Sequence, residues 1–290
     1  MERRREKAVE TLFFLCALTA AALLLLIAAF LISSGLPAIQ EIGLRNFLLG
    51  RIWDSANGEH PRFGILPLLL SSVYGAAGAL VLGLPLGLLT ALFLAKAAPR
   101  RLAAAIRALV RLLAGIPSVV CGLVGMTVLV PLLRERLDLP AGDGLLAAVV
   151  VLAVMVLPPV IEVSEDALAA VPRSYEEASL ALGATEEETW LHVSLPAAGS
   201  GVAAAAALGA GRAVGEAMAV LMVAGNAANM PASLRSVRLL TSGIAMELSY
   251  AAAGSLRQRA LYSIALVLFV VILLINALLY FAQRGGRRPC

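Results

Sequence analysis

Two opposite charges, Arg212 and Glu216, stand four residues apart in an otherwise apolar stretch of the chain. This spacing places both side chains on one helix face, about one turn apart. They can form an ion pair that neutralises itself and only fixes packing. Alternatively, Arg212 offers a guanidinium to an oxyanion, because its planar fork binds two oxygens and stays charged, while Glu216 holds it in place. Each charge costs on the order of 2.5–3.5 kcal/mol near the bilayer centre, so we favour the functional interpretation.

A polar loop at residues 172–196 interrupts the second half of the chain, and we call it the 172–196 loop. Gly183 stands where a glycine closes a helix. Two residue pairs have capping-box spacing, Ser174 with Glu177 and Thr185 with Glu188. We expect a rigid helix–glycine–helix unit at the membrane surface, with Pro196 opening the next membrane span.

The elements that must position these groups are membrane helices. Apolar residues make up 60% of the 290 residues and charged residues only 14%, which is typical of polytopic membrane proteins. About 20 apolar residues cross a bilayer as a helix, because lipid offers no partner to unpaired main-chain groups. We therefore expect an all-α polytopic membrane protein with six transmembrane helices, at residues 11–33, 64–97, 108–133, 144–163, 197–224 and 260–282.

The distribution of charge predicts the topology. Basic residues cluster at both termini and in the segment 99–111, so we place both termini on the cytoplasmic side. The first apolar run is longer than a signal-peptide core, which favours a retained signal anchor. Arg100, Arg107 and Arg111 fall near one face of an expected amphipathic surface helix. Two longer outside connections, 34–62 and 225–259, can meet a partner, and Trp53 in the first suits the membrane interface.

Several kinds of chemistry are disfavoured. Cys16, Cys121 and Cys290 have no metal-ligand or disulfide spacing, so we expect no metal site. A phosphate-cradling loop needs Gly-Lys-Ser/Thr, whereas the two lysines follow Glu and Ala. The chain is therefore expected to be a non-enzymatic subunit. An ion-coupled secondary transporter also uses intramembrane charges and broken helices, and it stays an alternative. An intramembrane hydrolase is less favoured because no histidine lies inside a span.

The 172–196 loop resembles a known family. Its order Glu-Ala-Ser, three residues, Gly, nine residues, Val-Ser-Leu-Pro is similar to the EAA loop of ABC-importer permeases, with Ser179 and Val193 in place of the usual Ala and Ile. The resemblance implies the type I (MetI-like) permease fold and a coupling helix that docks on a separate ATPase subunit. ATP and Mg²⁺ would then be used by that subunit, and this chain would bind no cofactor. The coupling residues carried over are Glu177, Ala178, Ser179, Gly183, Val193, Leu195 and Pro196.

Further segments resemble the PstC-type permease of the phosphate importer: Phe63-Gly-Ile-Leu-Pro67, Leu113-Ala-Gly-Ile-Pro-Ser-Val-Val120, the Arg212–Asn226 segment and the segment 239–252. This resemblance implies transport of inorganic phosphate across the bacterial cytoplasmic membrane. The implied partners are a PstA-like second permease, two ATPase subunits and an extracytoplasmic phosphate-binding protein. Molybdate and sulfate remain alternative cargoes. The matching segments begin at residue 63, so we expect residues 1–62 to form an N-terminal helix and outside connection, and 63–290 the permease core.

Overall fold

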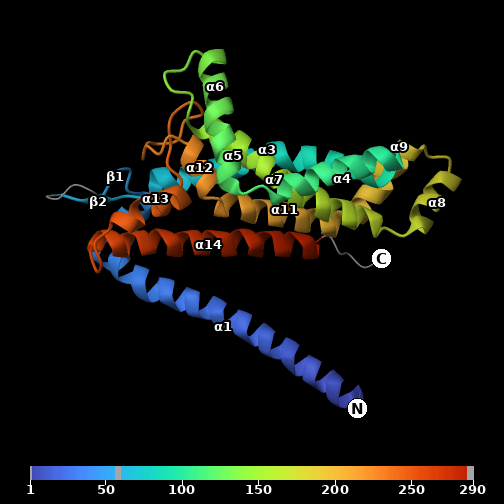
Figure 1. Cartoon of the computed structure of the whole chain (residues 1–290), viewed down its shortest axis with the longest axis horizontal. Coiled ribbons are helices and arrows are strands. Elements are labelled where there is room, and N and C mark those ends of the chain that lie inside the picture. Colours follow the sequence, from blue (N-terminus) through green and yellow to red (C-terminus); the bar gives the residue numbers. More distant parts are fainter. Residues whose placement is uncertain (1, 56–59, 286–290) are drawn as a thin grey trace.

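The computed structural model describes residues 2–55 and 60–285, which are predominantly helical (Figure 1). The first half contains α1 (Glu2–Ile42), α2 (Leu44–Leu49), α3 (Leu66–Leu92), α4 (Arg100–Gly115), α5 (Ser118–Val124) and α6 (Val130–Arg136). The second half contains α7 (Leu145–Ala169), α8 (Arg173–Ala181), α9 (Glu186–Thr189), α10 (Leu195–Ala197), α11 (Gly199–Gly215), α12 (Met218–Val223), α13 (Leu240–Glu247) and α14 (Leu256–Gly285). Short π-helical turns at Phe93–Ala97, Gly125–Leu129 and Trp190–Ser194, and a 3₁₀ turn at Leu248–Tyr250, extend neighbouring helices.

Two short strands were not expected from the sequence. β1 (Trp53–Asp54) and β2 (Arg62–Phe63) pair antiparallel, with Trp53 opposite Phe63. The rings of that pair meet edge to face with centroids 5.7 Å apart. The expectation that Trp53 lies at the membrane interface is wrong, because its side chain is buried.

Five helices are long and apolar enough to cross a membrane, or six if α11 and the bent helix before it count as one span; this holds for the described residues. The first, second, fourth and sixth expected spans correspond to helices α1, α3, α7 and α14. The third begins at Ser118 and not at 108, because Ile116 and Pro117 are extended and separate it from the surface helix α4. Arg107 of α4 holds α7 through Glu165, with 2.6 Å between the charged groups.

The fifth expected span, 197–224, is not one continuous helix. α11 ends at Gly215, Glu216 is extended with φ −71° and ψ 126°, and α12 begins at Met218. At its other end, α11 follows α10 after a bend of 70°. Pro196 lies within α10, so the expectation that it opens the span is wrong, and the span begins at Gly199.

The centre of the bundle is α7, which packs against α3 and α11. Small residues let these helices approach closely. A methyl group at Gly87 of α3 would lie 2.6 Å from Cγ1 of Val160, and one at Gly125 would lie 2.8 Å from Cγ2 of Val151. Val156 and Val160 are fully buried as a result. Packing therefore requires glycine at positions 87 and 125, whereas Gly211 and Gly215 of α11 face open space.

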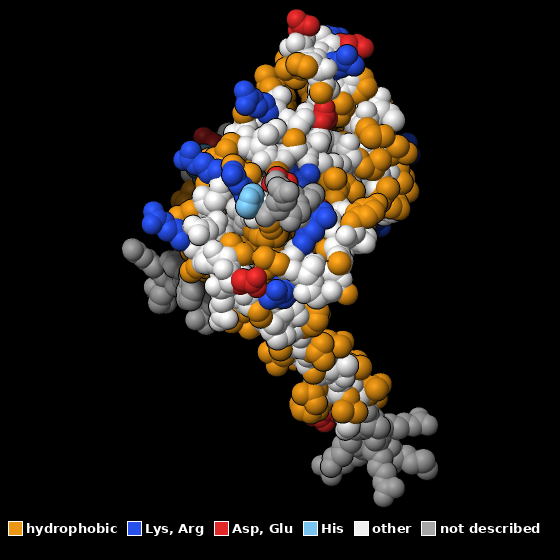
Figure 2. Space-filling view, turned by 90° about the vertical axis from the view of Figure 1, so that its left-hand side faces the viewer, with side chains coloured by type: hydrophobic (Ala, Val, Ile, Leu, Met, Phe, Trp, Pro, Cys, Tyr) orange, Lys and Arg blue, Asp and Glu red, His pale blue; other side chains and the backbone are white. Residues whose placement is uncertain are grey.

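The bundle has two distinct ends (Figure 1). The loop end carries α8 and α9. The hairpin end, opposite to it, carries β1, β2 and α13. Helix α1 contacts α14 and then diverges from the rest of the bundle toward its N-terminus. Figure 2 looks onto the hairpin end and shows several basic side chains around the middle of that face.

Candidate functional site

The 172–196 loop folds as two short helices joined by a glycine turn. At the second helix, the Thr185 hydroxyl accepts from the Glu188 main-chain N–H at 3.3 Å, and Glu188 accepts from the Thr185 N–H at 2.9 Å. This confirms the expected capping box. These hydrogen bonds from Thr185 hold the pKa of the Glu188 carboxyl below its usual range. The box expected at Ser174 and Glu177 is wrong, because α8 begins at Arg173 after Pro172 and no side chain caps it.

Gly183 closes α8 as expected. Its φ is +92°, in the left-handed region that glycine adopts without strain. The N–H of Gly183 donates to the carbonyl oxygen of Leu180 at 3.0 Å, and that of Ala184 to Ser179 at 3.3 Å. These two bonds satisfy the last carbonyls of α8 in the Schellman arrangement. The turn between the helices is therefore a defined, hydrogen-bonded structure.

A polar cluster fastens this loop to the bundle. The Glu176 carboxylate accepts hydrogen bonds from Lys96 Nζ, at the end of the second span, and from Ser194 Oγ at 2.8 Å. The side chains of Lys96 and Glu176 are only 12% and 21% exposed. Burial opposes the charge on Glu176, yet the bonds from Lys96 and Ser194 outweigh it and lower the pKa of this carboxyl. A second link joins the two loop helices, 2.8 Å between the hydroxyls of Ser179 and Thr189.

The residues of the EAA-like motif fall into two groups. Glu177, Ala178, Gly183 and Pro196 are exposed, whereas Ser179, Val193 and Leu195 are half-buried and fix the loop against the bundle. Leu182, at the tip of the turn, is 90% exposed. Tyr175, Leu180 and Leu191 of the same loop are exposed as well. Several exposed apolar side chains in one loop are typical of a surface that meets another protein.

Arg212 and Glu216 are not neighbours on one helix face. Arg212 lies in the last turn of α11, and Glu216 lies beyond the helix end. Their side chains form no ion pair with each other. Instead, the Glu216 carboxylate accepts from the main-chain N–H of Ala219 at 3.2 Å and caps α12. The expected shared face is wrong because the helix unwinds between the two charges.

Arg212 lines an open hollow of about 600 Å³ on the exposed side of α11. Pro159 of α7 and Asn276 of α14 contribute to the same hollow. Among the described residues, the Arg212 guanidinium has no hydrogen bond or ion pair. A charged side chain within a membrane span must face protein or water. This guanidinium is therefore available to a mobile anion or to a partner on that side.

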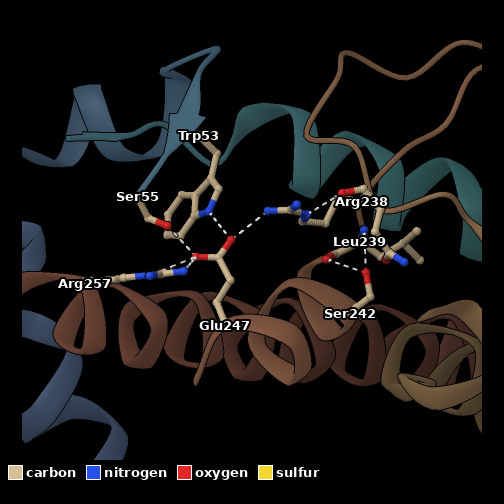
Figure 3. Close-up of polar contacts among 8 residues, drawn as sticks. Trp53, Ser55, Arg238, Leu239, Ser242, Glu247 and Arg257 are labelled. Atoms are coloured by element: carbon tan, nitrogen blue, oxygen red, sulfur yellow. Dashed lines mark hydrogen bonds and ion pairs between the residues drawn. The ribbon is translucent and has the colours of Figure 1, made fainter. Parts of the chain in front are cut away.

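The break at Glu216 is joined to the hairpin end through α13. The Thr241 hydroxyl donates to the carbonyl oxygen of Glu216 at 2.7 Å. At the other end of α13, the nearly buried Glu247 carboxylate accepts from Trp53 Nε1 at 2.8 Å, from Arg238 Nη1 at 2.7 Å, and also from the Ser55 hydroxyl (Figure 3). Arg257 contributes a second ion pair at 3.1 Å. The Glu247 carboxylate thus connects the segment around Trp53, the segment around Arg238 and the start of α14.

Sequence reasoning missed the residues that make long-range contacts. Lys96 carried a weak signal, as one of two lysines in the chain. Glu247 lay in a segment with family resemblance, but its partners are 192 and 194 residues away for Ser55 and Trp53. Asn276 lies in an apolar run, and nothing in the sequence marked it as a site residue.

No group of three or more potential metal ligands occurs in residues 2–55 and 60–285. Cys16 and Cys121 are free, and Cys290 lies outside the described residues.

The arrangement agrees with the comparisons to known proteins. The family model for the binding-protein-dependent transport system inner membrane component matches residues 83–285. A probable ABC transporter permease, YqgH of Bacillus subtilis, is 36% identical over 93% of this chain and 88% of its own length. The phosphate transport system permease PstC of Haemophilus influenzae is 33% identical over 91% and 89%. PstC 2 of Mycobacterium tuberculosis is 34% identical over 95% and 90%.

Solved structures agree on the fold. The bacterial alginate ABC transporter, in complex with a periplasmic protein, is 16% identical with a TM-score of 0.61 and covers 94% of this chain and 96% of its own. The inward-facing MetNI methionine ABC transporter is 24% identical with a TM-score of 0.58, over 78% and 95%. The chain thus has the type I, MetI-like permease fold and is a transport subunit of an ABC importer, not an enzyme. This excludes the ion-coupled secondary transporter. The chain is a multi-pass membrane protein that belongs to the family of binding-protein-dependent transport system inner membrane components.

Proposed function

We propose that this permease conducts inorganic phosphate inward by alternating access. The observation that carries the proposal is the unpaired Arg212 guanidinium, which faces an open hollow at the broken fifth span. A planar, permanently charged group without a carboxylate partner is suited to a passing oxyanion. Among the relatives, the proteins named as phosphate permeases support phosphate over molybdate or sulfate.

Glu216 has a different role from the one its spacing suggests. Since its carboxylate caps α12 and its carbonyl accepts from Thr241, it holds the break in place instead of neutralising Arg212. We propose that the break is the element that changes shape between the two states of the bundle. Unwound main chain in a membrane helix is tolerated where protein or water satisfies it, and it is typical of transport pathways.

The conformational change driven by ATP hydrolysis would be transmitted to this chain through the 172–196 loop. Glu177, Ala178 and Gly183, with Leu182 at the tip, would form the docking surface for the ATPase subunit. Ser179, Val193 and Leu195 would hold that surface on the bundle, with Pro196 exposed beside them. Lys96, Glu176 and Ser194 would pass its movement to the second span. ATP and Mg²⁺ would be used by the ATPase subunits alone.

The remaining partners follow from this assignment. A PstA-like permease would face the Arg212 hollow, two ATPase subunits would contact the loop end, and an extracytoplasmic phosphate-binding protein would dock at the hairpin end. Both termini would then lie in the cytoplasm of a bacterial cell, as the basic residues favour. The family match at 83–285 supports residues 63–290 as the transport core and 1–62 as its N-terminal attachment.

Uptake of radiolabelled phosphate by the assembled transporter tests the proposal. Arg212→Gln should lower uptake by about tenfold or more, because it removes a charge-assisted contact, while the ATPase still co-purifies. Arg134→Gln, at an exposed arginine outside the hollow, is the matched control. Normal uptake by the Arg212 variant would remove this residue from the mechanism. Excess sulfate or molybdate that abolishes uptake as well as unlabelled phosphate does would assign another cargo.

A further inference from the structure

A groove of about 730 Å³ opens at the hairpin end, where three membrane helices end or begin. Ile42, the last residue of α1, and Leu256, the first of α14, line it, and Gly64 lies just before α3. Because these are the ends of helices that cross the bilayer, the groove lies at the level of the membrane surface. It is separate from the Arg212 hollow and from the 172–196 loop.

Three arginines line this groove: Arg45, Arg51 and Arg62. All three are exposed, and none has an ion pair within residues 2–55 and 60–285. Its acidic lining residue, Glu41, is already paired with Arg259 at 3.0 Å. With three arginines and one carboxylate, the lining of the groove carries a net positive charge.

The groove is preformed. Phe47 of α2 is fully buried, and its carbonyl oxygen accepts from the N–H of Ile65 at 2.9 Å. The carbonyl oxygen of Gly50 accepts from the N–H of Leu66 at 3.1 Å, which holds α2 against the start of α3. The main chains at Gly50 and Gly64 approach so closely that a side chain at Gly64 would clash with Gly50. The main chain that carries the three arginines is thus already held in place. A ligand could bind without first ordering that main chain.

Large aliphatic side chains stand beside the arginines. Leu44, Leu49 and Ile52 are 60%, 58% and 49% exposed, although they belong to a segment anchored by buried Phe47. Leu49 and Ile52 line the groove itself. Exposed aliphatic groups alternating with arginines at the level of the bilayer surface are typical of segments that insert into the lipid interface. An acidic protein surface would complement the charge, but it would leave these aliphatic side chains without an apolar partner.

We propose that this groove binds the headgroup of an anionic phospholipid. Its phosphate would contact the guanidinium groups of Arg45, Arg51 and Arg62, and its acyl chains would lie along Leu44 and the exposed side of α1. Arg suits this role because its fork can contact two phosphate oxygens at once. A lipid held here would fix α1 and α2 relative to α3 and α14 at the membrane surface.

Lipid retention by the transporter, purified with the subunits that accompany this chain, tests the proposal by native mass spectrometry. The probes are phosphatidylglycerol and phosphatidylcholine with identical acyl chains. We expect selective retention of phosphatidylglycerol, which the combined variant Arg45→Gln, Arg51→Gln, Arg62→Gln lowers by about tenfold or more, given the contribution of each arginine near an anionic surface. The combined variant Arg45→Lys, Arg51→Lys, Arg62→Lys should retain an intermediate amount, because lysine keeps the charge but not the two-oxygen fork. The matched control is Arg134→Gln, Arg136→Gln, Arg235→Gln, three exposed arginines outside the groove.

Three results would overturn the proposal. The first is equal retention of the two lipids by the wild type, and the second is unchanged retention in the triple glutamine variant. The third is that inorganic phosphate at millimolar concentration displaces the lipid completely, which would make the groove a site for the free ion. Should the glutamine variant instead lose affinity for the extracytoplasmic binding protein while keeping its lipid, the groove would be a protein-docking surface. Size-exclusion chromatography of every variant verifies that the assembly is intact.

Discussion

The Thr241 hydroxyl and the Glu216 main-chain carbonyl oxygen are joined by a 2.7 Å hydrogen bond, although the residues belong to different segments of the chain. Glu216 is the extended residue at which the fifth span breaks, and Thr241 lies in the first turn of α13. The other end of α13 is Glu247, which is held by Trp53, Arg238 and Arg257. Helix α13 therefore links the hairpin end directly to the break, so a force on one can reach the other.

Replacing Thr241 with Val should destabilise the break. The Glu216 carbonyl would lose its partner in a buried setting, since Thr241 is only 7% exposed, and an unsatisfied buried acceptor costs about 1–3 kcal/mol. We expect this decrease in the free energy of unfolding of the purified protein in detergent, measured by denaturant titration, together with slower uptake.

Thr241→Ser should keep most of the stability, because it restores the hydroxyl. Thr127→Val is the matched control, since Thr127 is exposed and its hydroxyl donates only within its own helical segment, to the carbonyl oxygens of Leu123 and Val124. Equal unfolding free energies for Thr241→Val and Thr127→Val would contradict a structural role for the bond to Glu216.

Replacing Glu247 with Gln should destabilise the hairpin end. The Glu247 side chain is 10% exposed and neutralises two guanidinium groups, Arg238 and Arg257. Removing one partner of such a buried pair costs about 3–5 kcal/mol, because it leaves uncompensated charge. The thermal midpoint of unfolding should fall, and Glu135→Gln, at an exposed carboxylate of α6, should leave it unchanged.

The triple variant Arg238→Gln, Glu247→Gln, Arg257→Gln separates charge from packing. If uncompensated charge is the cause, the triple variant should unfold at a higher temperature than Glu247→Gln alone. A lower midpoint would mean that the hydrogen bonds, and not the charge balance, hold the cluster together.

The sequence predicted features that depend on local chemistry. The Thr185–Glu188 box and the Gly183 turn need only residues within five positions of one another, so spacing alone reveals them. The long apolar spans were equally accessible, because any helix of that composition must be buried in lipid or protein. The Ser174–Glu177 pair had the same spacing and failed, because the N-cap of α8 is Pro172, two residues before the Ser174 N-cap that the box requires.

Long-range contacts could not be predicted. The segment around Glu216 reads as a continuous helix, and its break is stabilised by Thr241, 25 residues away. Lys96 and Glu176 are 80 residues apart. A single sequence does not show that the turn Phe93–Ala97 lies beside α8, so it could not predict this ion pair. The separation of Arg212 from Glu216 had the same cause.

Exchanging the charges of Lys96 and Glu176 should test whether this pair transmits movement. Glu176→Lys alone places two cations together at a site where the side chains are 12% and 21% exposed, so we expect lower uptake and a weaker link between ATP hydrolysis and transport. Adding Lys96→Glu restores an opposite pair and should recover part of both. The measurement is the ratio of phosphate transported to ATP hydrolysed in proteoliposomes.

Glu165→Gln is the control for the exchange. It breaks the ion pair with Arg107, which holds α4 on α7 and does not involve the 172–196 loop. This variant should lose stability without changing the transport-to-hydrolysis ratio. If it lowers the ratio as much as Glu176→Lys does, the effect reflects general loosening of the bundle and not transmission through the loop.

The attachment of the 172–196 loop should weaken in acid. Burial opposes the charge on Glu176, but hydrogen bonds from Lys96 and Ser194 outweigh it and hold the pKa of this carboxyl below its usual value of 4.5 in the folded state. The unfolded state therefore binds the proton more tightly, and the stabilisation is fully present above pH 4.5 and lost as the pH falls through the folded pKa. Glu188, whose pKa is lowered by Thr185, acts in the same direction at the start of α9.

Intrinsic fluorescence can follow this acid transition, because Trp190 lies at the end of α9 beside the cluster and the other tryptophan is Trp53 at the hairpin end. The difference between wild type and Glu176→Gln cancels the signal of Trp53. We expect that difference to be constant at neutral pH and to vanish as the pH falls through the lowered pKa of Glu176, because protonated Glu176 then resembles Gln. A difference that grows in acid would mean that Lys96 and Ser194 hold the protonated carboxyl more tightly than the charged one.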